Sequence, residues 1–308
     1  MAQMVASRVE NDRDKPGLWP ADKIILAYSA FTFAIELIWY SQIPQASWML
    51  ALHGVGAVLI VLASRGLNTN DRLVAWLFKV VRNWYPLLFV AWCYREMSYL
   101  IAAIRHFHAD QALADLDYSI WGASPTIWLQ RVYSPVLTES LQIVYTLFLP
   151  MALLVPWLIW RKGRFAEFRY MTFLLALGFL VSYIGYLIVP ARGPRYLLAH
   201  LYTVPLRGLW GFDSMQETLN RLEKDHFDCF PSGHTELTVL ACWLSRSISN
   251  RLFWVYFLYT LCIVFATVYL RYHYTPDLMA GFMVALVLIL AAPALYRGLT
   301  EKGDSIGD

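Results

Sequence analysis

The sequence predicts an all-α integral membrane protein with about eight transmembrane helices. Of its 308 residues, 58% are hydrophobic and only 15% are charged, whereas a soluble domain is nearer half apolar and a quarter charged. Several apolar segments approach the roughly 20 residues that a helix needs to cross a bilayer. Lysine and arginine also gather in alternate connecting segments, as they do in membrane proteins of fixed orientation.

The predicted spans follow the apolar segments in chain order. They cover residues 24–40, 47–63, 84–104, 136–160, 169–189, 233–249, 252–270 and 276–296. Residues 71–83 carry Arg72, Lys79 and Arg82 among apolar side chains, which predicts an interfacial helix that lies flat on the membrane. We therefore divide the chain into residues 1–83, with the N-terminal tail, two membrane helices and this interfacial helix, and residues 84–308, with the core.

The basic residues set the predicted orientation. They precede the first span, follow the second, fourth and sixth, and end the chain, whereas the loop from Ser41 to Ser47 contains none. Both termini are therefore expected in the cytoplasm. The long loops 105–135 and 190–231, the second with a short helix near 214–225, then face the periplasm of a bacterium or the lumen of an organelle.

The composition and the spacing of residue types argue against several other classes of protein and binding site. The net charge of +3 comes without a basic run, so no nucleic-acid partner is expected. The four cysteines show no C-x-x-C spacing, which argues against a disulfide framework or a thiolate metal site. There is no lysine-containing phosphate loop and no aspartate cluster for Mg²⁺. We expect no cofactor and no metal.

A first polar motif, Cys229 to Thr235, stands at the start of the sixth span. Ser232 is suited to cap that helix, whose free backbone N–H groups and dipole would then attract an anion. Gly233 allows close backbone approach, and His234 would lie ready to donate a proton. The alternative is an ordinary capped helix with a histidine at the membrane interface.

A second polar motif, Tyr269 to Asp277, separates the seventh and eighth spans. Asp277 is expected to reach back to His273, fixing the tautomer and leaving the other ring nitrogen free to attack. The alternatives are a structural His–Asp pair, or a metal site of His234, His273 and Asp277 for which no fourth ligand is evident.

A third motif, Pro190 to Arg195, ends the fifth span on the same predicted face. Arg192 and Arg195 would form a guanidinium clamp for phosphate, although both could instead extend to the membrane interface. Arg271, in the second motif, opposes the charge bias of this face and is harder to explain in that way. Together the three motifs suit the handling of a phosphate group.

The residues Phe230-Pro231-Ser232-Gly233-His234-Thr235, and His273-Tyr274 with Asp277 and Ala280-Gly281, resemble two signature motifs of the type 2 phosphatidic acid phosphatase superfamily. The resemblance implies a six-helix phosphatase-like core, metal-independent catalysis and a phosphohistidine intermediate. It makes His273 the nucleophile, Asp277 its partner and His234 the acid. The implied phosphate ligands are Arg192, Arg195, Ser232, Gly233 and Arg271.

Two departures from the family pattern resemble the branch of inositol phosphorylceramide synthases. Ala266-Thr267 stands where a Ser-Arg pair is common, and Ile188 stands where the first motif has lysine. We therefore expect a membrane phosphatase or phosphotransferase that acts on lipid phosphate esters, with membrane lipids as partners. The alternatives are a non-catalytic lipid-phosphate-binding protein or transporter, and a halide-oxidising enzyme of similar site design.

Charged residues inside the predicted spans need an explanation of their own, because charge is costly there. Arg95 and Glu96 lie in the third span and Glu36 in the first. We interpret them as structural pairs, and His53 in the second span as a hydrogen-bonded core histidine.

Overall fold

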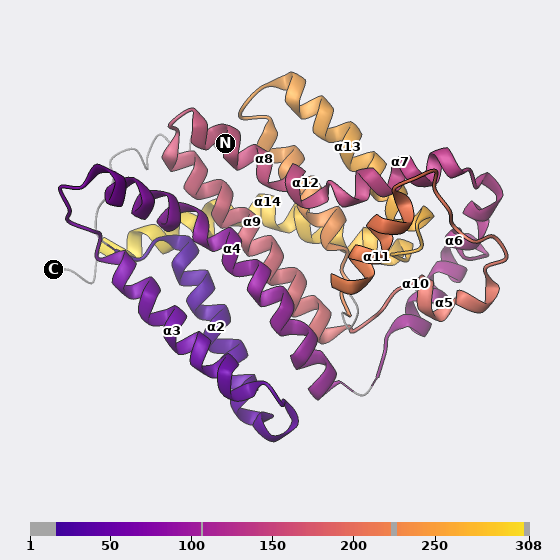
Figure 1. Cartoon of the computed structure of the whole chain (residues 1–308), viewed down its shortest axis with the longest axis horizontal. Helices are drawn as coiled ribbons and strands as arrows, with labels where there is room; N and C mark the ends of the chain where they lie inside the picture. Colours follow the sequence, from indigo (N-terminus) through magenta and orange to yellow (C-terminus); the bar gives the residue numbers. More distant parts are fainter. Residues whose placement is uncertain (1–16, 106, 223–226, 305–308) are drawn as a thin grey trace. The chain divides into compact units, whose positions relative to one another are not determined.

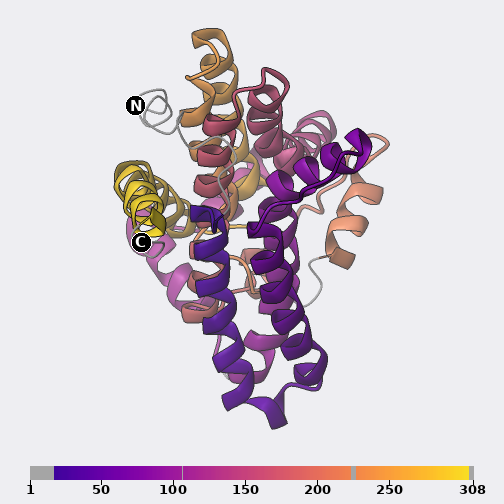
Figure 2. The ribbon, with the colours of Figure 1, turned by 90° about the vertical axis from the view of Figure 1, so that its left-hand side faces the viewer.

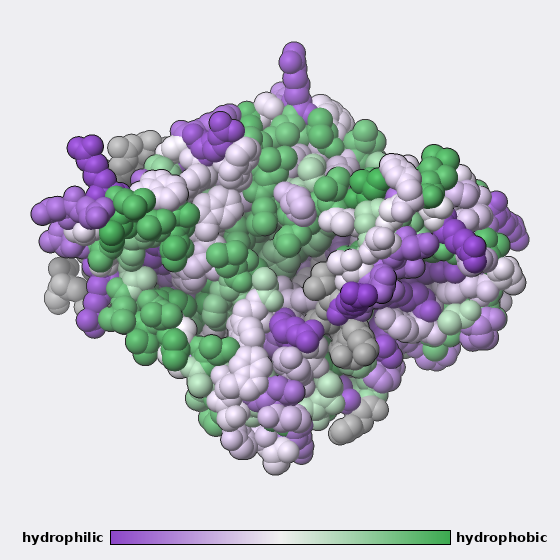
Figure 3. Space-filling model, viewed as in Figure 1, coloured by the Kyte–Doolittle hydropathy of each residue, from purple (hydrophilic) through white to green (hydrophobic). Residues whose placement is uncertain are grey.

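The computed structural model describes residues 17–105, 107–222 and 227–304. Over these ranges the chain forms helices, turns and loops, with one isolated β-bridge between Ala191 and Asp228. Large apolar side chains, among them Val58, Leu59 and Leu258, are exposed on the helices. Figure 3 shows broad apolar areas on one face, as lipid contact requires. The predicted all-α membrane architecture is confirmed.

The helices follow the apolar segments (Figure 1). They are α2 (Pro20–Ile38), η2 (Tyr40–Gln42), α3 (Ala46–Ser64), α4 (Arg72–Ile104), α5 (Asp110–Trp121), α6 (Pro125–Trp128), η3 (Leu129–Val132), α7 (Pro135–Thr146), α8 (Phe148–Arg161), α9 (Phe165–Ile188), α10 (Pro194–Leu197), η4 (Ala199–Leu201), α11 (Phe212–Leu222), α12 (Gly233–Ser245), α13 (Asn250–Tyr269) and α14 (Thr275–Asp304). Within the described residues, α3, α4, α9, α13 and α14 are long and apolar enough to cross a membrane, and α7 with α8 forms a bent sixth candidate. Of the other two predicted spans, α2 carries Asp22, Lys23 and Glu36, and α12 has only 13 residues.

The predicted span 136–160 is broken into α7 and α8, which meet at an angle of 45°. Pro150 explains the break. It has no N–H to donate to the carbonyl group of Thr146, four residues earlier, and its ring crowds that group. Thr146 is the last residue of α7.

Residues 71–83, expected to form a separate interfacial helix, are continuous with α4, of which residues from Arg72 onward form the first turns. Their predicted position at the membrane surface stays a prediction. The Asp71 carboxylate accepts hydrogen bonds from the backbone N–H groups of Leu73 (2.8 Å) and Val74 (3.1 Å), which fixes the helix start. From there the helix continues through Pro86 to Ile104. The domain boundary expected at residue 83 therefore falls inside one helix.

The chain divides into two compact units. The first contains residues 1–104, 156–180 and 288–308; in it α2 packs against α3 and α4, which lie side by side in both ribbon views (Figures 1 and 2). The second contains residues 105–155 and 181–287, in which α13 packs against α12 and α7, and α11 against α7. Every site residue expected from the sequence belongs to the second unit.

The two long loops, 105–135 and 190–231, contain short helices. The first holds α5, α6 and η3, and the second holds α10, η4 and α11. The short helix expected near 214–225 is present as α11, although residues 223–226 lie outside the described ranges.

Candidate active site

The first motif begins α12 as its sequence predicts. The side-chain oxygen of Ser232 accepts a hydrogen bond from the backbone N–H of Thr235 at 3.3 Å, which caps the helix. The backbone N–H of Ser232 donates to the carbonyl oxygen of Asp277 at 3.0 Å. The start of α12 is thereby tied to the first turn of α14, which carries the second motif.

The second motif turns the chain sharply between α13 and α14. Arg271 adopts a positive φ of 67°, and the backbone N–H groups of Tyr272 and His273 both donate to the carbonyl oxygen of Thr267, at 2.9 and 3.2 Å. This turn directs His273 toward α12. The ring centroids of His234 and His273 lie 5.6 Å apart, so the structure brings together the two histidines that the sequence paired.

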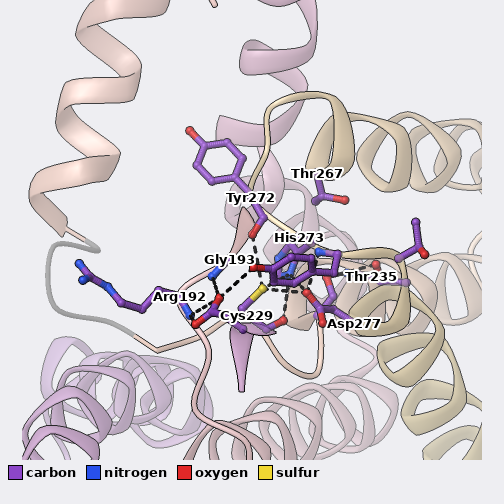
Figure 4. Close-up of polar contacts among 12 residues, drawn as sticks. Arg192, Gly193, Cys229, Thr235, Thr267, Tyr272, His273 and Asp277 are labelled. Atoms are coloured by element: carbon purple, nitrogen blue, oxygen red, sulfur yellow. Dashed lines mark hydrogen bonds and ion pairs between the residues drawn. The ribbon is translucent and has the colours of Figure 1, made fainter. Parts of the chain in front are cut away.

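The tautomer of His273 is set by a backbone group. Its Nδ1 atom lies 2.9 Å from the carbonyl oxygen of Cys229 and 3.4 Å from Oδ2 of Asp277 (Figure 4). A carbonyl oxygen only accepts, so Nδ1 carries the ring proton and Nε2 keeps its lone pair. The sequence attributed this role to Asp277, which stands slightly farther from Nδ1.

Asp277 is fully buried and has two other hydrogen-bond donors. Its Oδ2 atom accepts from the Cys229 thiol at 2.7 Å and from the backbone N–H of Tyr274 at 2.8 Å. Burial, together with the Asp277 carboxylate, raises the pKa of the Cys229 thiol well above its usual range. Cys229 is therefore a protonated donor at neutral pH that holds Asp277 beside the imidazole ring.

His234 is held by aromatic contacts instead of a carboxylate. Its ring stacks on Tyr145 (4.4 Å between centroids), which stacks on Tyr272 (4.3 Å), and the Arg195 guanidinium lies over Tyr272 at 4.6 Å. No described carboxylate forms an ion pair with His234. The expectation that His234 is protonated before substrate binds therefore has no supporting partner among the described residues.

The other two arginines point to different neighbours. Arg192 lies over the ring of Tyr196 at 4.2 Å, and Figure 4 shows its side chain directed away from His273. The buried Arg271 donates to the carbonyl oxygen of Val204 at 2.6 Å and stacks on Tyr202 at 3.9 Å. Their expected phosphate contacts would require both side chains to turn, and remain a prediction.

Comparison with known proteins agrees with this geometry. The family model described as the PAP2 superfamily matches residues 111–291, more than half of the chain. The chain belongs to the PAP2 superfamily. It is also 31% identical over 121 residues to a PA-phosphatase related-family protein of Dictyostelium discoideum, a match that covers 38% of this chain and 21% of the relative. No solved structure shows a significant match.

Two aspartates that sequence reasoning placed only in a loop support this PAP2-superfamily site. Asp110 accepts hydrogen bonds from the backbone N–H groups of Arg192 (3.0 Å) and Gly193 (2.7 Å) and from the Tyr274 hydroxyl (3.2 Å). Asp117 accepts from the backbone N–H of Thr275 at 3.0 Å. Their spacing of seven residues puts both on one face of α5, and this periodicity was the available signal.

Two glycines allow the motifs to approach closely. A Cβ atom on Gly193, which has a φ of 97°, would collide with the carbonyl oxygen of Tyr272. One on Gly281 would collide with the carbonyl oxygen of Ser232. The Ala280-Gly281 pair therefore serves the packing of α14 against the start of α12.

One group of metal-ligand types lies within this site. Donor atoms of Cys229, His273 and Asp277 all fall within 4.8 Å of one another, whereas His234 is not part of the group. The three atoms already bond to each other and to backbone groups: the thiol donates to Asp277, and His273 Nδ1 donates to a carbonyl oxygen. A metal here would displace both hydrogen bonds. The alternative metal set of His234, His273 and Asp277 is not brought together as one cluster among the described residues.

Proposed function

We propose that this protein is a membrane-embedded enzyme that cleaves or transfers the phosphoryl group of lipid phosphate esters through a phosphohistidine on His273. The observation that carries the proposal is the pairing of His273, with a free Nε2 lone pair, and His234 at a centroid separation of 5.6 Å. One phosphoryl group between the rings can touch both. Membership of the PAP2 superfamily supports a phosphatase-type activity on phosphate esters.

In the first step Nε2 of His273 attacks phosphorus and a P–N bond forms. The P–O bond to the lipid alcohol breaks, and that oxygen takes a proton from His234. Because Nδ1 keeps its proton, the phosphorylated ring is cationic. The carboxylate of Asp277, 3.4 Å from Nδ1, offsets this charge.

In the second step water or an acceptor alcohol attacks phosphorus and gives its proton to His234. The P–N bond breaks, which restores Nε2 of His273 and a protonated His234. Since no described carboxylate is paired with His234, we infer that the anionic substrate itself favours protonation of this ring in the first cycle. The backbone N–H groups at the start of α12 and the guanidinium of Arg195 would bind the phosphate oxygens.

Transfer to a lipid alcohol is favoured over simple hydrolysis by the departure from the family pattern at Thr267. Thr267, which replaces the more common arginine, accepts the two backbone hydrogen bonds that shape the turn before His273. This departure resembles the branch of inositol phosphorylceramide synthases. The test is to incubate the purified protein with labelled phosphatidate, prenyl diphosphate and phospholipid donors, with and without alcohol acceptors. Release of free phosphate would indicate hydrolysis, and a new labelled lipid would indicate transfer. Absence of both products would favour the non-catalytic lipid-binding or transport alternative.

We further propose that catalysis is independent of metal and that the site faces the periplasm or lumen. Turnover should survive chelator treatment of protein that a thermal-unfolding scan shows to be folded, whereas loss of turnover that Zn²⁺ restores would contradict this. A membrane-impermeant amine reagent tests the orientation. In sealed vesicles whose cytoplasmic face points inward, the N-terminal Lys15 and Lys23 should be protected, and labelling of them would reverse the predicted topology.

A further inference from the structure

A second cluster of ionisable side chains lies in the other compact unit, apart from the proposed chemistry. Each of three helices contributes one member: Glu36 from α2, His53 from α3 and Glu96 from α4. Their donor atoms all lie within 4.8 Å of one another, and the two glutamates are completely buried, with His53 4% exposed. From the sequence we interpreted the two glutamates as members of structural pairs and His53 as a hydrogen-bonded core histidine.

The contacts converge on one atom, Nε2 of His53. It lies 3.0 Å from Oε1 of Glu96, 3.3 Å from Oε1 of Glu36 and 3.3 Å from the hydroxyl of Thr32. A ring nitrogen carries at most one proton, so it can donate to only one of these oxygens. The hydrogen bond goes to Glu96, and neither oxygen of Glu36 has a hydrogen-bond partner among the described residues.

Charge in this cluster is not balanced by any described side chain. His53 is the only ion-pair partner of either glutamate within the described ranges, and Arg95 lies over the ring of Tyr99 instead. With both glutamates ionised, the buried cluster would carry one negative charge more than a protonated His53 offsets, and the Glu36 carboxylate has no geometric hydrogen-bond partner among the described residues.

We propose that Glu36, His53 and Glu96 bind a first-row divalent cation, with Zn²⁺ as the best-suited ion. A divalent ion neutralises both carboxylates and accepts the lone pair of Nε2, while the ring proton rests on Nδ1. Ligands at Zn–N and Zn–O distances of about 2.0–2.1 Å around a tetrahedral ion stand about 3.3 Å apart, close to the 3.0 and 3.3 Å that separate Nε2 of His53 from the Glu96 and Glu36 oxygens. The Thr32 hydroxyl lies 3.3 Å from Nε2, beside the proposed ligands.

The donor set restricts the ion. An imidazole nitrogen beside two carboxylate oxygens suits Zn²⁺, Mn²⁺, Fe²⁺ or Co²⁺, whereas Mg²⁺ and Ca²⁺ prefer oxygen ligands alone. Because each ligand comes from a different helix, the ion would join α2, α3 and α4. Bound metal should therefore raise the thermal stability of the protein in addition to appearing in its metal content.

The test is metal analysis of the purified full chain together with variants of similar shape. Wild type should retain one metal ion per chain and, after removal and reloading with Co²⁺, show visible absorption bands of a low-coordinate site. His53→Gln and Glu96→Gln should weaken binding by at least about 10–100-fold, the effect of losing only an outer-shell partner. Both should also lose the thermal shift that Zn²⁺ produces in wild type.

Two control variants distinguish metal bound by Glu36, His53 and Glu96 from metal bound elsewhere in the protein. Glu167→Gln removes another glutamate of the same unit, one that is paired with Arg164, and should leave metal content unchanged. His273→Ala removes the histidine of the other candidate cluster and should also leave it unchanged. Wild type that takes up neither Zn²⁺ nor Co²⁺ would overturn the proposal, as would metal lost in His273→Ala but kept in His53→Gln. The first outcome leaves the phosphohistidine mechanism untouched, whereas the second would also contradict metal-independent catalysis at His273.

Discussion

Nδ1 of His273 lies 2.9 Å from the backbone carbonyl oxygen of Cys229. The contact joins the two signature motifs of the site, and it leaves Nε2 as the ring nitrogen available for the attack that we propose. Because a backbone carbonyl cannot be removed by substitution, the residues that hold it in place offer the most informative experiments.

The Cys229 thiol should matter as a hydrogen-bond donor. Cys229→Ala removes the donor to Asp277 and leaves a buried carboxylate with one partner fewer, so we expect kcat to fall about 10-fold or more. Cys229→Ser keeps a donor of similar size and should retain most of the activity. The measurement is kcat with one lipid phosphate at saturation. An equal loss of kcat in the two variants would show that Cys229 supports activity through packing and not through its hydrogen bond to Asp277.

The raised pKa of the same thiol predicts a pH dependence for its alkylation. Only the thiolate reacts, and a raised pKa moves its formation to higher pH. In a variant with Cys93, Cys242 and Cys262 replaced by alanine, Cys229 should react with N-ethylmaleimide far more slowly than a free thiol at neutral pH. The labelling rate should rise only when the pH exceeds the usual pKa range of a cysteine thiol. Fast labelling at neutral pH would mean that Cys229 is exposed or ionised.

Asp110 should be needed for activity although we assign it no contact with substrate. Asp110→Asn weakens the acceptor of two backbone N–H groups in the first motif and of the Tyr274 hydroxyl, and we expect a loss of about 1–3 kcal/mol in transition-state stabilisation. Asp115→Asn is the matched control, since Asp115 is exposed on the same helix and bonds only to Gln111 among the described residues. If kcat/KM falls equally in both variants, the loop contacts are not what supports the site.

Gly281 should tolerate no side chain. In Gly281→Ala the new methyl group meets the carbonyl oxygen of Ser232, so α14 must move from the start of α12 at a cost of about 1–3 kcal/mol. Gly298→Ala lies in the same helix with open space around it and should leave stability and turnover nearly unchanged. The measurements are the thermal unfolding temperature and the kcat of both variants. A silent Gly281→Ala would show that the close approach of α12 and α14 is absent in solution.

The meeting of His234 and His273 was predictable from the sequence. The two apolar segments between the motifs, predicted as the spans 233–249 and 252–270, imply antiparallel neighbours that return the chain to the same face. The order of the helices was therefore predicted, although α12 has only 13 residues. The cap at Ser232 was predictable for a similar reason, since it depends on a local pattern of residue types.

Other features depend on atoms that carry no signature in one sequence. The carbonyl oxygen of Cys229 is present in every residue, so nothing in the residue type marks it as the partner of His273. The directions of Arg192 and Arg271 are set by the rings of Tyr196 and Tyr202, which only the fold brings near. The continuity of α4 through residue 83 was missed because the basic residues interspersed among apolar ones over 71–83 were interpreted as a membrane-surface helix.

The phosphohistidine itself can be trapped with His234→Ala and an aryl phosphate as substrate. A nitrophenolate leaves without needing a proton, so the first step should proceed, while the second step lacks its base. We expect labelled phosphate to accumulate on His273 as an alkali-stable, acid-labile adduct that mass spectrometry locates, and to be absent when His273→Ala is added. Turnover of lipid phosphate by the His273→Ala single variant, or an adduct on any other residue, would contradict the account.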